Sequence, residues 1–215
     1  MNKISEPKLE YNSVYHIYNC GINGCNLFIS DEDYEHFLSK YALYIEPIAV
    51  TYAWSLLGNH FHLVIRIKKE SEISTIAELG LFEKKATIKT TDKKPDPTRQ
   101  FSHLFNSYAQ YFNNKYKRHG SLFERPFHKK LIDNQTYFKR CLIYVHQNPV
   151  KHGFVERLSE YRYTSYNTIL SEQITFIQRE TVLNLFENLT DFMESHKELV
   201  SFEESFDYEH NIYQP

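Results

Sequence analysis

GNHFHLVI, residues 58–65, is the stretch of this 215-residue sequence that says most about its fold. Gly58 and Asn59 form a turn signal, and the apolar run after them has the composition of a strand. Because residues i and i+2 of a strand point to the same face, His60 and His62 should stand side by side, with Phe61 turned into the core. We expect the histidine face of this strand to point outward.

Two imidazoles on one strand face can hold one divalent metal ion, although the same pair could be ordinary surface histidines. A third candidate ligand and a candidate nucleophile lie in YVHQNPV, residues 144–150. Tyr144 and Asn148 are spaced i and i+4, so they share one face of a helix. An amide oxygen beside two imidazoles suits Mg²⁺ or Mn²⁺ bound to phosphate, and a phenol one turn away can act as a covalent nucleophile.

The segments around these two motifs complete a β-α-β-β-α-β-α order. Runs of β-branched and aromatic residues predict strands at residues 14–18, 48–57, 60–68 and 127–132. Three helices are expected: one from residue 31 behind a Ser30–Asp33 capping box, one from residue 101 to a break at Gly120, and one stopped by Pro149. The first six elements match the ferredoxin-like pattern, an α+β fold with helices on one face of an antiparallel four-stranded sheet.

Charge is distributed unevenly along the chain, whose formal net charge is −2. Residues 84–130 hold twelve Lys or Arg against three acidic residues, whereas residues 171–215 hold ten Asp or Glu against two basic residues. A basic middle suits contacts with nucleic-acid phosphates, with a solvated loop or helix end as the alternative. The candidate phosphate-binding residues are Lys115, Lys117, Arg118, His119, Arg125, Lys129 and Lys130.

Composition narrows the class of protein. No apolar run approaches the roughly 20 residues that a membrane-spanning helix needs, and the first residues lack an apolar signal region. Cys20, Cys25 and Cys141 give neither a disulfide framework nor a paired metal-binding spacing. We therefore expect a cytoplasmic protein with no membrane partner.

Four stretches together resemble the single-tyrosine HUH transposases and, within them, the REP-associated tyrosine transposases of bacteria. They are residues 15–21 (YHIYNCG), 58–65, 120–127 (GSLFERPF) and 144–155 (YVHQNPVKHGFV), in a likeness that runs from about residue 11 to residue 166. By this resemblance His60 and His62 fall on metal-ligand positions. Asn148 falls on the third-ligand position, and Tyr144 on that of the nucleophile.

The resemblance implies cleavage of single-stranded DNA near a hairpin, through a 5′-phosphotyrosine intermediate and a free 3′-OH. A second strand's 3′-OH would resolve the intermediate without ATP. The implied partner is single-stranded or hairpin DNA, and the implied cofactor is Mg²⁺ or Mn²⁺; relatives include homodimers and monomers, which leaves the oligomeric state open. Cys20 departs from the family, where arginine is expected, and the loss of that charge could weaken a DNA contact.

Two other functions compete with the metal-dependent DNA nickase and strand transferase. One is a domesticated protein that binds hairpin or single-stranded DNA with little catalysis. The other is a structural metalloprotein that uses His60, His62 and Cys20, which we disfavour because Cys20 is expected beyond the end of the first strand. The presence of both histidines together with Tyr144 and Asn148 favours the enzyme.

Domain limits follow from the same patterns. We expect the transposase-like domain at residues 1–166, with a flexible lysine-rich insertion at residues 83–98, and a helical acidic extension at residues 167–215. The extension could oppose DNA binding through its charge. Alternatively it could pack on the domain through a helical stripe formed by Phe176, Leu183, Phe186 and Leu189.

Overall fold

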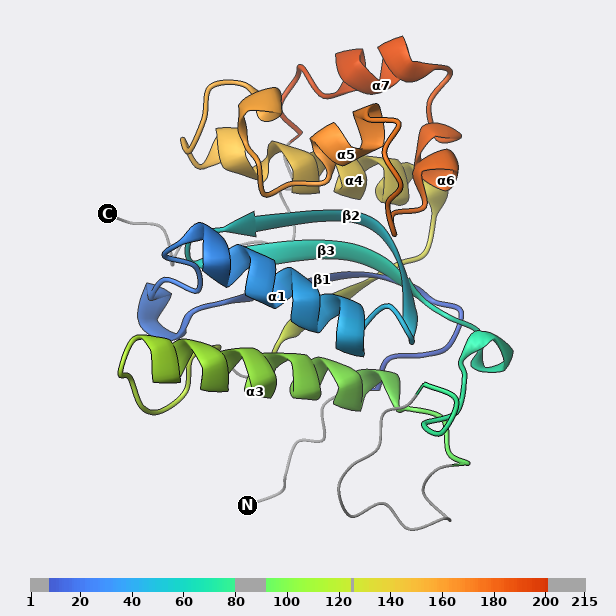
Figure 1. The fold of residues 1–215 in the computed structure, drawn as a ribbon. Coiled ribbons are helices and arrows are strands. Elements are labelled where there is room, and N and C mark those ends of the chain that lie inside the picture. The colour runs from blue at the N-terminus through green and yellow to red at the C-terminus, as the bar shows by residue number, and fades with distance from the viewer. Residues whose placement is uncertain (1–7, 80–91, 125, 201–215) are drawn as a thin grey trace.

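The computed structural model describes residues 8–79, 92–124 and 126–200, and in them a four-stranded antiparallel sheet lies between two layers of helices (Figure 1). The strands are β1 (Val14–Cys20), β2 (Ala49–Leu57), β3 (His60–Ile67) and β4 (His128–Ile132). The longer helices are α1 (Asp31–Tyr44), α3 (Pro97–Lys115) and α4 (Gln135–Lys151). Shorter helices are α5 (Tyr166–Leu170), α6 (Arg179–Leu183) and α7 (Leu189–Ser195), with 3-10 turns at Ile22–Gly24, Glu70–Glu72 and Leu158–Glu160.

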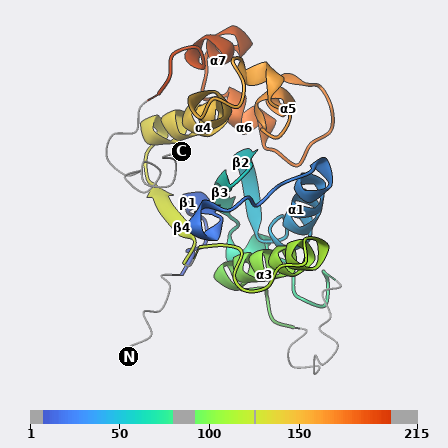
Figure 2. The same cartoon turned by 90° about the vertical axis from the view of Figure 1, so that its left-hand side faces the viewer.

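The strand order β2-β3-β1-β4 confirms the predicted ferredoxin-like topology. Helices α1 and α3 cover one face of the sheet, and α4 covers the other together with α5, α6 and α7 (Figures 1 and 2). Because both faces are covered, β3 is buried along nearly its whole length. The sheet therefore has two apolar layers rather than one.

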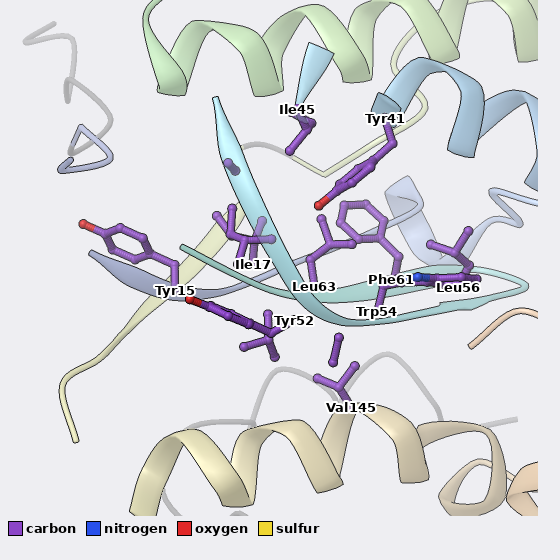
Figure 3. Packing of buried hydrophobic residues seen from close by; sticks show 14 of the residues in the cluster. Tyr15, Ile17, Tyr41, Ile45, Tyr52, Trp54, Leu56, Phe61, Leu63 and Val145 are labelled. Atoms are coloured by element: carbon purple, nitrogen blue, oxygen red, sulfur yellow. The ribbon is translucent and has the colours of Figure 1, made fainter. Parts of the chain in front are cut away.

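Packing on the two faces uses the alternation of the strands. Tyr41 and Ile45 point from the α1 side toward the sheet, and Phe61 points from β3 to that same side, while Val145 approaches from α4 on the opposite side (Figure 3). All four side chains are buried. Burial of such side chains contributes about 1.5–3 kcal/mol each, so this two-sided core fixes the position of α4 against the sheet.

The N-terminus of α1 is tied to the C-terminus of α3 through one buried carboxylate. Asp33 completes the predicted capping box, accepting from the backbone N–H of Ser30 at 2.9 Å. It also accepts from Lys115 Nζ at 2.8 Å and from the Tyr116 hydroxyl at 2.7 Å. Burial would raise the pKa of Asp33, but these hydrogen bonds outweigh it and lower the pKa to about 2.

Several predicted boundaries were wrong. Helix α3 begins at Pro97 and is capped by Asp96, so residues 97 and 98 of the expected insertion belong to the first turn of this helix. Helix α3 also ends earlier than predicted, at Lys115 rather than at Gly120. Helix α4 continues through Pro149 to Lys151. Proline removes one N–H donor, but N–H groups that follow the helix donate to its last carbonyl oxygens. One of these is the His152 N–H, which donates to the backbone carbonyl oxygen of Asn148 at 3.0 Å. Strand β1 runs to Cys20, two residues further than expected.

The C-terminal helices pack on α4 and on the outer edge of β2. Thr51 of β2 bridges to Ile177, and Ser55 bridges to Thr164. The predicted stripe was wrong in its members, because Phe176 and Leu189 are 39% and 44% exposed. Two short helices replace the single expected one, and the buried contacts come from Ile177, Val182, Phe186 and Phe192. Residues 83–91 of the expected insertion, and the end of the expected extension, lie outside the described residues.

A buried hydrogen-bonded chain joins α4 to α7. His146 Nδ1 lies 2.9 Å from His196 Nε2, and His146 Nε2 lies 2.8 Å from the Ser165 hydroxyl. His196 Nδ1 lies 2.6 Å from the carbonyl oxygen of Phe192, which can only accept. The protons are therefore ordered from Ser165 to His146 to His196 to this carbonyl, with both rings neutral.

Candidate active site

The face between β3 and α4 holds the two motifs singled out in the sequence. His60 and His62 point from β3 toward α4, with ring centroids 5.1 Å apart and planes at 86°. Tyr144 points back from α4, its ring centroid 5.7 Å from that of His62. Asn148 lies one turn further along α4, near enough to His60 to influence the pKa of that imidazole. The structure thus brings all four residues into one cluster.

The expectation that the histidines face outward was wrong. His60 and His62 are 3% and 1% exposed, and Tyr144 is 1% exposed. The reason is that α4 packs on this face of the sheet and covers both histidines. The cluster is therefore a buried site under a helix.

Hydrogen bonds set the orientation of the candidate ligands. The Asn148 amide donates from Nδ2 to the carbonyl oxygen of Tyr144 at 3.0 Å, which leaves Oδ1 as the end that faces His60. His60 Nδ1 lies 2.9 Å from Asn59 Oδ1, and His62 Nδ1 lies 3.0 Å from His16 Nε2. Since these contacts use Nδ1 in both rings, a metal ion would be bound through Nε2 of each ring.

The electrostatics keep the imidazoles neutral. Burial lowers the pKa of His60 and His62 well below the ordinary value, and the charge of Lys151 lowers it further. Burial and the charge of Lys130 lower the pKa of His16 to about 3, and burial and Lys151 lower that of His152 to about 4. A neutral imidazole is the form that binds a metal ion.

The donor set fits a divalent cation that also carries phosphate oxygens. Two imidazole nitrogens and one amide oxygen leave coordination positions for phosphate and water, as Mg²⁺ and Mn²⁺ require. Among the described residues, no group of three or more His, Cys, Asp or Glu side chains could hold a metal ion. The Asn148 amide is the candidate for a third protein ligand beside the two imidazoles.

Cys20 does not supply an alternative third ligand. It is the last residue of β1 and pairs with His60 in the register, so our reason for discounting it, a place beyond the strand, was wrong. Burial, however, raises the pKa of the Cys20 thiol to about 12. A metal ion binds the thiolate, which this environment disfavours.

Sequence reasoning missed three residues of the site. His16 contacts His62, and His152 lies with its ring centroid 5.2 Å from that of His60. Lys151 places its Nζ 4.8 Å from the centroid of the Tyr144 ring. The signal for Lys151 was present, because residues 144, 148 and 151 share one helical face. His16 depends on the register of β1 against β3, which no local pattern reveals.

The predicted phosphate-binding residues are not one surface. Lys115 is bound to Asp33, Glu32, Ser30 and Tyr111, so it ties α1 to α3 and we withdraw it as a DNA contact. Lys130 pairs with His16 on the α4 face, whereas Lys129 pairs with Ile17 on the opposite face.

The remaining basic candidates lie after α3. Lys117 and His119 are exposed, and Arg118 is half-buried with its guanidinium 5.6 Å from the centroid of the Phe112 ring. Arg125 lies outside the described residues. Lys117, Arg118 and His119 therefore stay candidates for contact with phosphate, as do Lys129 and Lys130.

The chain is similar to known proteins in sequence and in fold. No family model matches the chain. A Haemophilus influenzae protein described as a REP-associated tyrosine transposase is 27% identical over 126 residues, which cover 58% of this chain and 62% of that protein. The match thus spans less than two thirds of the relative's length.

The fold has a counterpart among solved structures. A REP-associated tyrosine transposase, solved bound to a REP hairpin, superposes with a TM-score of 0.53 and 14% identity, covering 80% of this chain and 87% of that one. None of the described helices is long and apolar enough to cross a membrane. The chain is thus similar in sequence to one REP-associated tyrosine transposase and similar in fold to another, in line with the resemblance of its motifs.

Proposed function

We propose that this protein is a metal-dependent endonuclease and strand transferase that acts on single-stranded DNA beside a hairpin. One observation carries the proposal: His60 and His62 from β3 and Tyr144 and Asn148 from α4, far apart in the sequence, form one buried cluster. The relationship to the tyrosine transposases supports it. A cytoplasmic, DNA-associated location follows from this function.

The chemistry assigned to the chain's own residues is a reversible phosphoryl transfer. Tyr144 Oη forms a bond to the phosphorus of a DNA phosphodiester while the bond from phosphorus to O3′ breaks. The phenolic proton passes to solvent, and O3′ leaves with the bonding pair and takes up a proton. A 3′-OH of another strand reverses the step, so no ATP is needed. Mg²⁺ or Mn²⁺ would be held by His60, His62 and Asn148 and would polarise the phosphate oxygens.

A second function is favoured by the burial of the nucleophile. Tyr144 is 1% exposed, so a scissile phosphate reaches it only if side chains over it move. A protein in which they do not move would bind hairpin DNA without cleaving it. This binding protein, with the same fold, is the alternative to the enzyme.

The two functions separate in one experiment. The protein is incubated with labelled hairpin DNA carrying a single-stranded flank, taken from around its own gene, with Mn²⁺, and covalent adducts are resolved on a denaturing gel. The enzyme gives an adduct in the wild type and none in Tyr144→Phe, which loses only the phenolic oxygen. Tyr137→Phe, a neighbour on the same helix, is the matched control and should retain the adduct. Hairpin binding with no adduct in the wild type would favour the alternative.

A further inference from the structure

Lys151 occupies a position from which it can serve the reacting group. It lies in the last turn of α4, spaced i+7 from Tyr144 and i+3 from Asn148, so the three residues share one helical face. Its Nζ is 4.8 Å from the centroid of the Tyr144 ring. The residue is exposed, whereas Tyr144 is buried. Lys151 therefore lies between solvent and the buried ring of Tyr144.

The charge of Lys151 affects the pKa of three imidazoles of the cluster. It is among the causes that lower the pKa of His60, His62 and His152, after burial in each case. These imidazoles are thereby kept neutral and supply no positive charge of their own. Lys130, another cation near the cluster, lies over Tyr137 with its Nζ 5.2 Å from that ring centroid. Lys151 is thus the cation that lies over the Tyr144 ring.

We infer that Lys151 is a further catalytic residue, one that binds the scissile phosphate and stabilises the charge on its non-bridging oxygens as Tyr144 attacks. The inference rests on the proposed function. A long, exposed ammonium can leave the ring face, with which it makes a weak cation–π contact, for the stronger partner that a phosphate offers. The same movement uncovers Tyr144. Bond changes are those given above, and Lys151 neither gains nor loses a proton.

The first test measures chemistry separately from binding. Lys151→Gln removes the charge at similar length, and Lys151→Arg keeps it. Adduct formation is followed in single turnover at saturating hairpin DNA with Mn²⁺. Lys151→Gln should slow it by about 10²–10³-fold, the usual effect of removing one group that stabilises a transition state. Lys151→Arg should recover most of the rate. Lys197→Gln removes an exposed lysine paired with Glu194 and should react as the wild type does.

A second readout needs neither metal nor turnover. The single-stranded flank is prepared with a 5′-phosphate, which mimics the group that becomes attached to Tyr144, and with a 5′-hydroxyl. Without divalent metal, the wild type should bind the phosphorylated strand more tightly, and Lys151→Gln should bind the two strands equally. Because Lys151 is exposed, thermal melting should show both variants folded.

The outcomes distinguish this inference from the function on which it rests. Two results would overturn the role of Lys151 and leave the proposed function standing. In one, Lys151→Gln forms the adduct at the wild-type rate; in the other, Lys151→Arg forms it as slowly as Lys151→Gln does. If the wild type forms no adduct, the proposed function fails and the catalytic role with it. The binding measurement then shows whether Lys151 still binds a phosphate. If Lys151→Gln prefers the 5′-phosphorylated strand as strongly as the wild type does, Lys151 does not bind the phosphate either.

Discussion

His60 and His62 combine two roles, because they are candidate ligands and also part of a packed layer. Their side chains lie against Tyr144, His16 and one another, with less than one twentieth of their surface exposed. Removing them therefore affects both metal binding and folding. The surface location expected from the sequence would have predicted an effect on metal binding only.

We expect His60→Ala with His62→Ala to abolish Mn²⁺ binding, measured by titration calorimetry, and to reduce the free energy of unfolding by about 1–3 kcal/mol even without metal. Exposed His119→Ala is the matched control and should alter neither. Mn²⁺ binding by the double variant as tight as by the wild type would rule out this metal site.

Lys115 has a structural role that its position in a basic segment concealed. Lys115→Met leaves the buried Asp33 carboxylate without its cation, although the Tyr116 hydroxyl and the Ser30 backbone N–H still donate to it. We expect a loss of about 1–3 kcal/mol in the free energy of unfolding, less than for a fully buried pair because the lysine is partly exposed. Hairpin affinity should be unchanged. A large loss of affinity in a variant that melts normally would restore Lys115 as a DNA contact.

The residues that sequence reasoning found are those whose spacing has a local meaning. The i, i+2 histidines and the i, i+4 tyrosine and asparagine each require only one regular element, so both pairs could be predicted to share a face. His16 and His152 required knowledge of the register of β1 against β3 and of where α4 ends. The burial of the site depended on a helix packing on the second face, which a strand pattern does not specify.

At the scale of elements, α4 carries the site and is held from both sides. The sheet contacts it through Val145, and the chain from Ser165 through His146 to His196 ties it to β2 and α7. The prediction that α4 stops at Pro149 was wrong. Pro149 removes one hydrogen bond, but it lies near the end of the helix, where the carbonyl oxygens accept from other donors. The short α6 and α7 were read as one helix, since the apolar spacing alone does not reveal the break between them.

The histidine chain predicts a pH dependence of folding. Burial is the main cause that lowers the pKa of His196 from 6.5 to about 4, and burial also lowers that of His146. Because the folded pKa lies below the unfolded one, the unfolded state binds more protons between these values. Stability from these neutral rings is fully present above about pH 6.5 and is lost as the pH falls toward 4.

His196→Gln tests this dependence. The amide keeps an acceptor for His146 but cannot titrate. The variant should be less stable at pH 7.5 by about 1–3 kcal/mol, since one buried hydrogen bond changes. Its stability should also fall less steeply than that of the wild type between pH 6.5 and 4, as followed by urea unfolding at several pH values. Parallel slopes for the two proteins would show that His196 does not titrate on unfolding.

At the scale of the whole molecule, residues 167–200 complete the layer that covers α4. Phe186 and Phe192 are buried, and Ile177 bridges to the edge of β2. We expect a chain ending at residue 166 to aggregate or to lose its cooperative thermal melt. A chain ending at residue 200 keeps every described contact and is the matched control, which should melt as the full chain does. A soluble, cooperatively folded product of the shorter truncation would contradict this account.

The topology of the sheet was predictable because each of the first six strands and helices has its own hydrophobic periodicity and its own turn or cap residues. The resulting order of strands and helices matches the ferredoxin-like arrangement. The arrangement of the C-terminal helices was not, because it is determined by long-range contacts with α4 and β2. Tyr144 is buried between α4 and β3, which makes the identity of the nucleophile the central claim to test.

The most direct measurement identifies the residue that becomes attached to DNA. The adduct formed with hairpin DNA and Mn²⁺ is digested with nuclease and protease, and the modified peptide is sequenced by mass spectrometry. The account predicts a nucleotide linked through its 5′-phosphate to Tyr144. Attachment at Tyr137, or at any residue other than Tyr144, would contradict it.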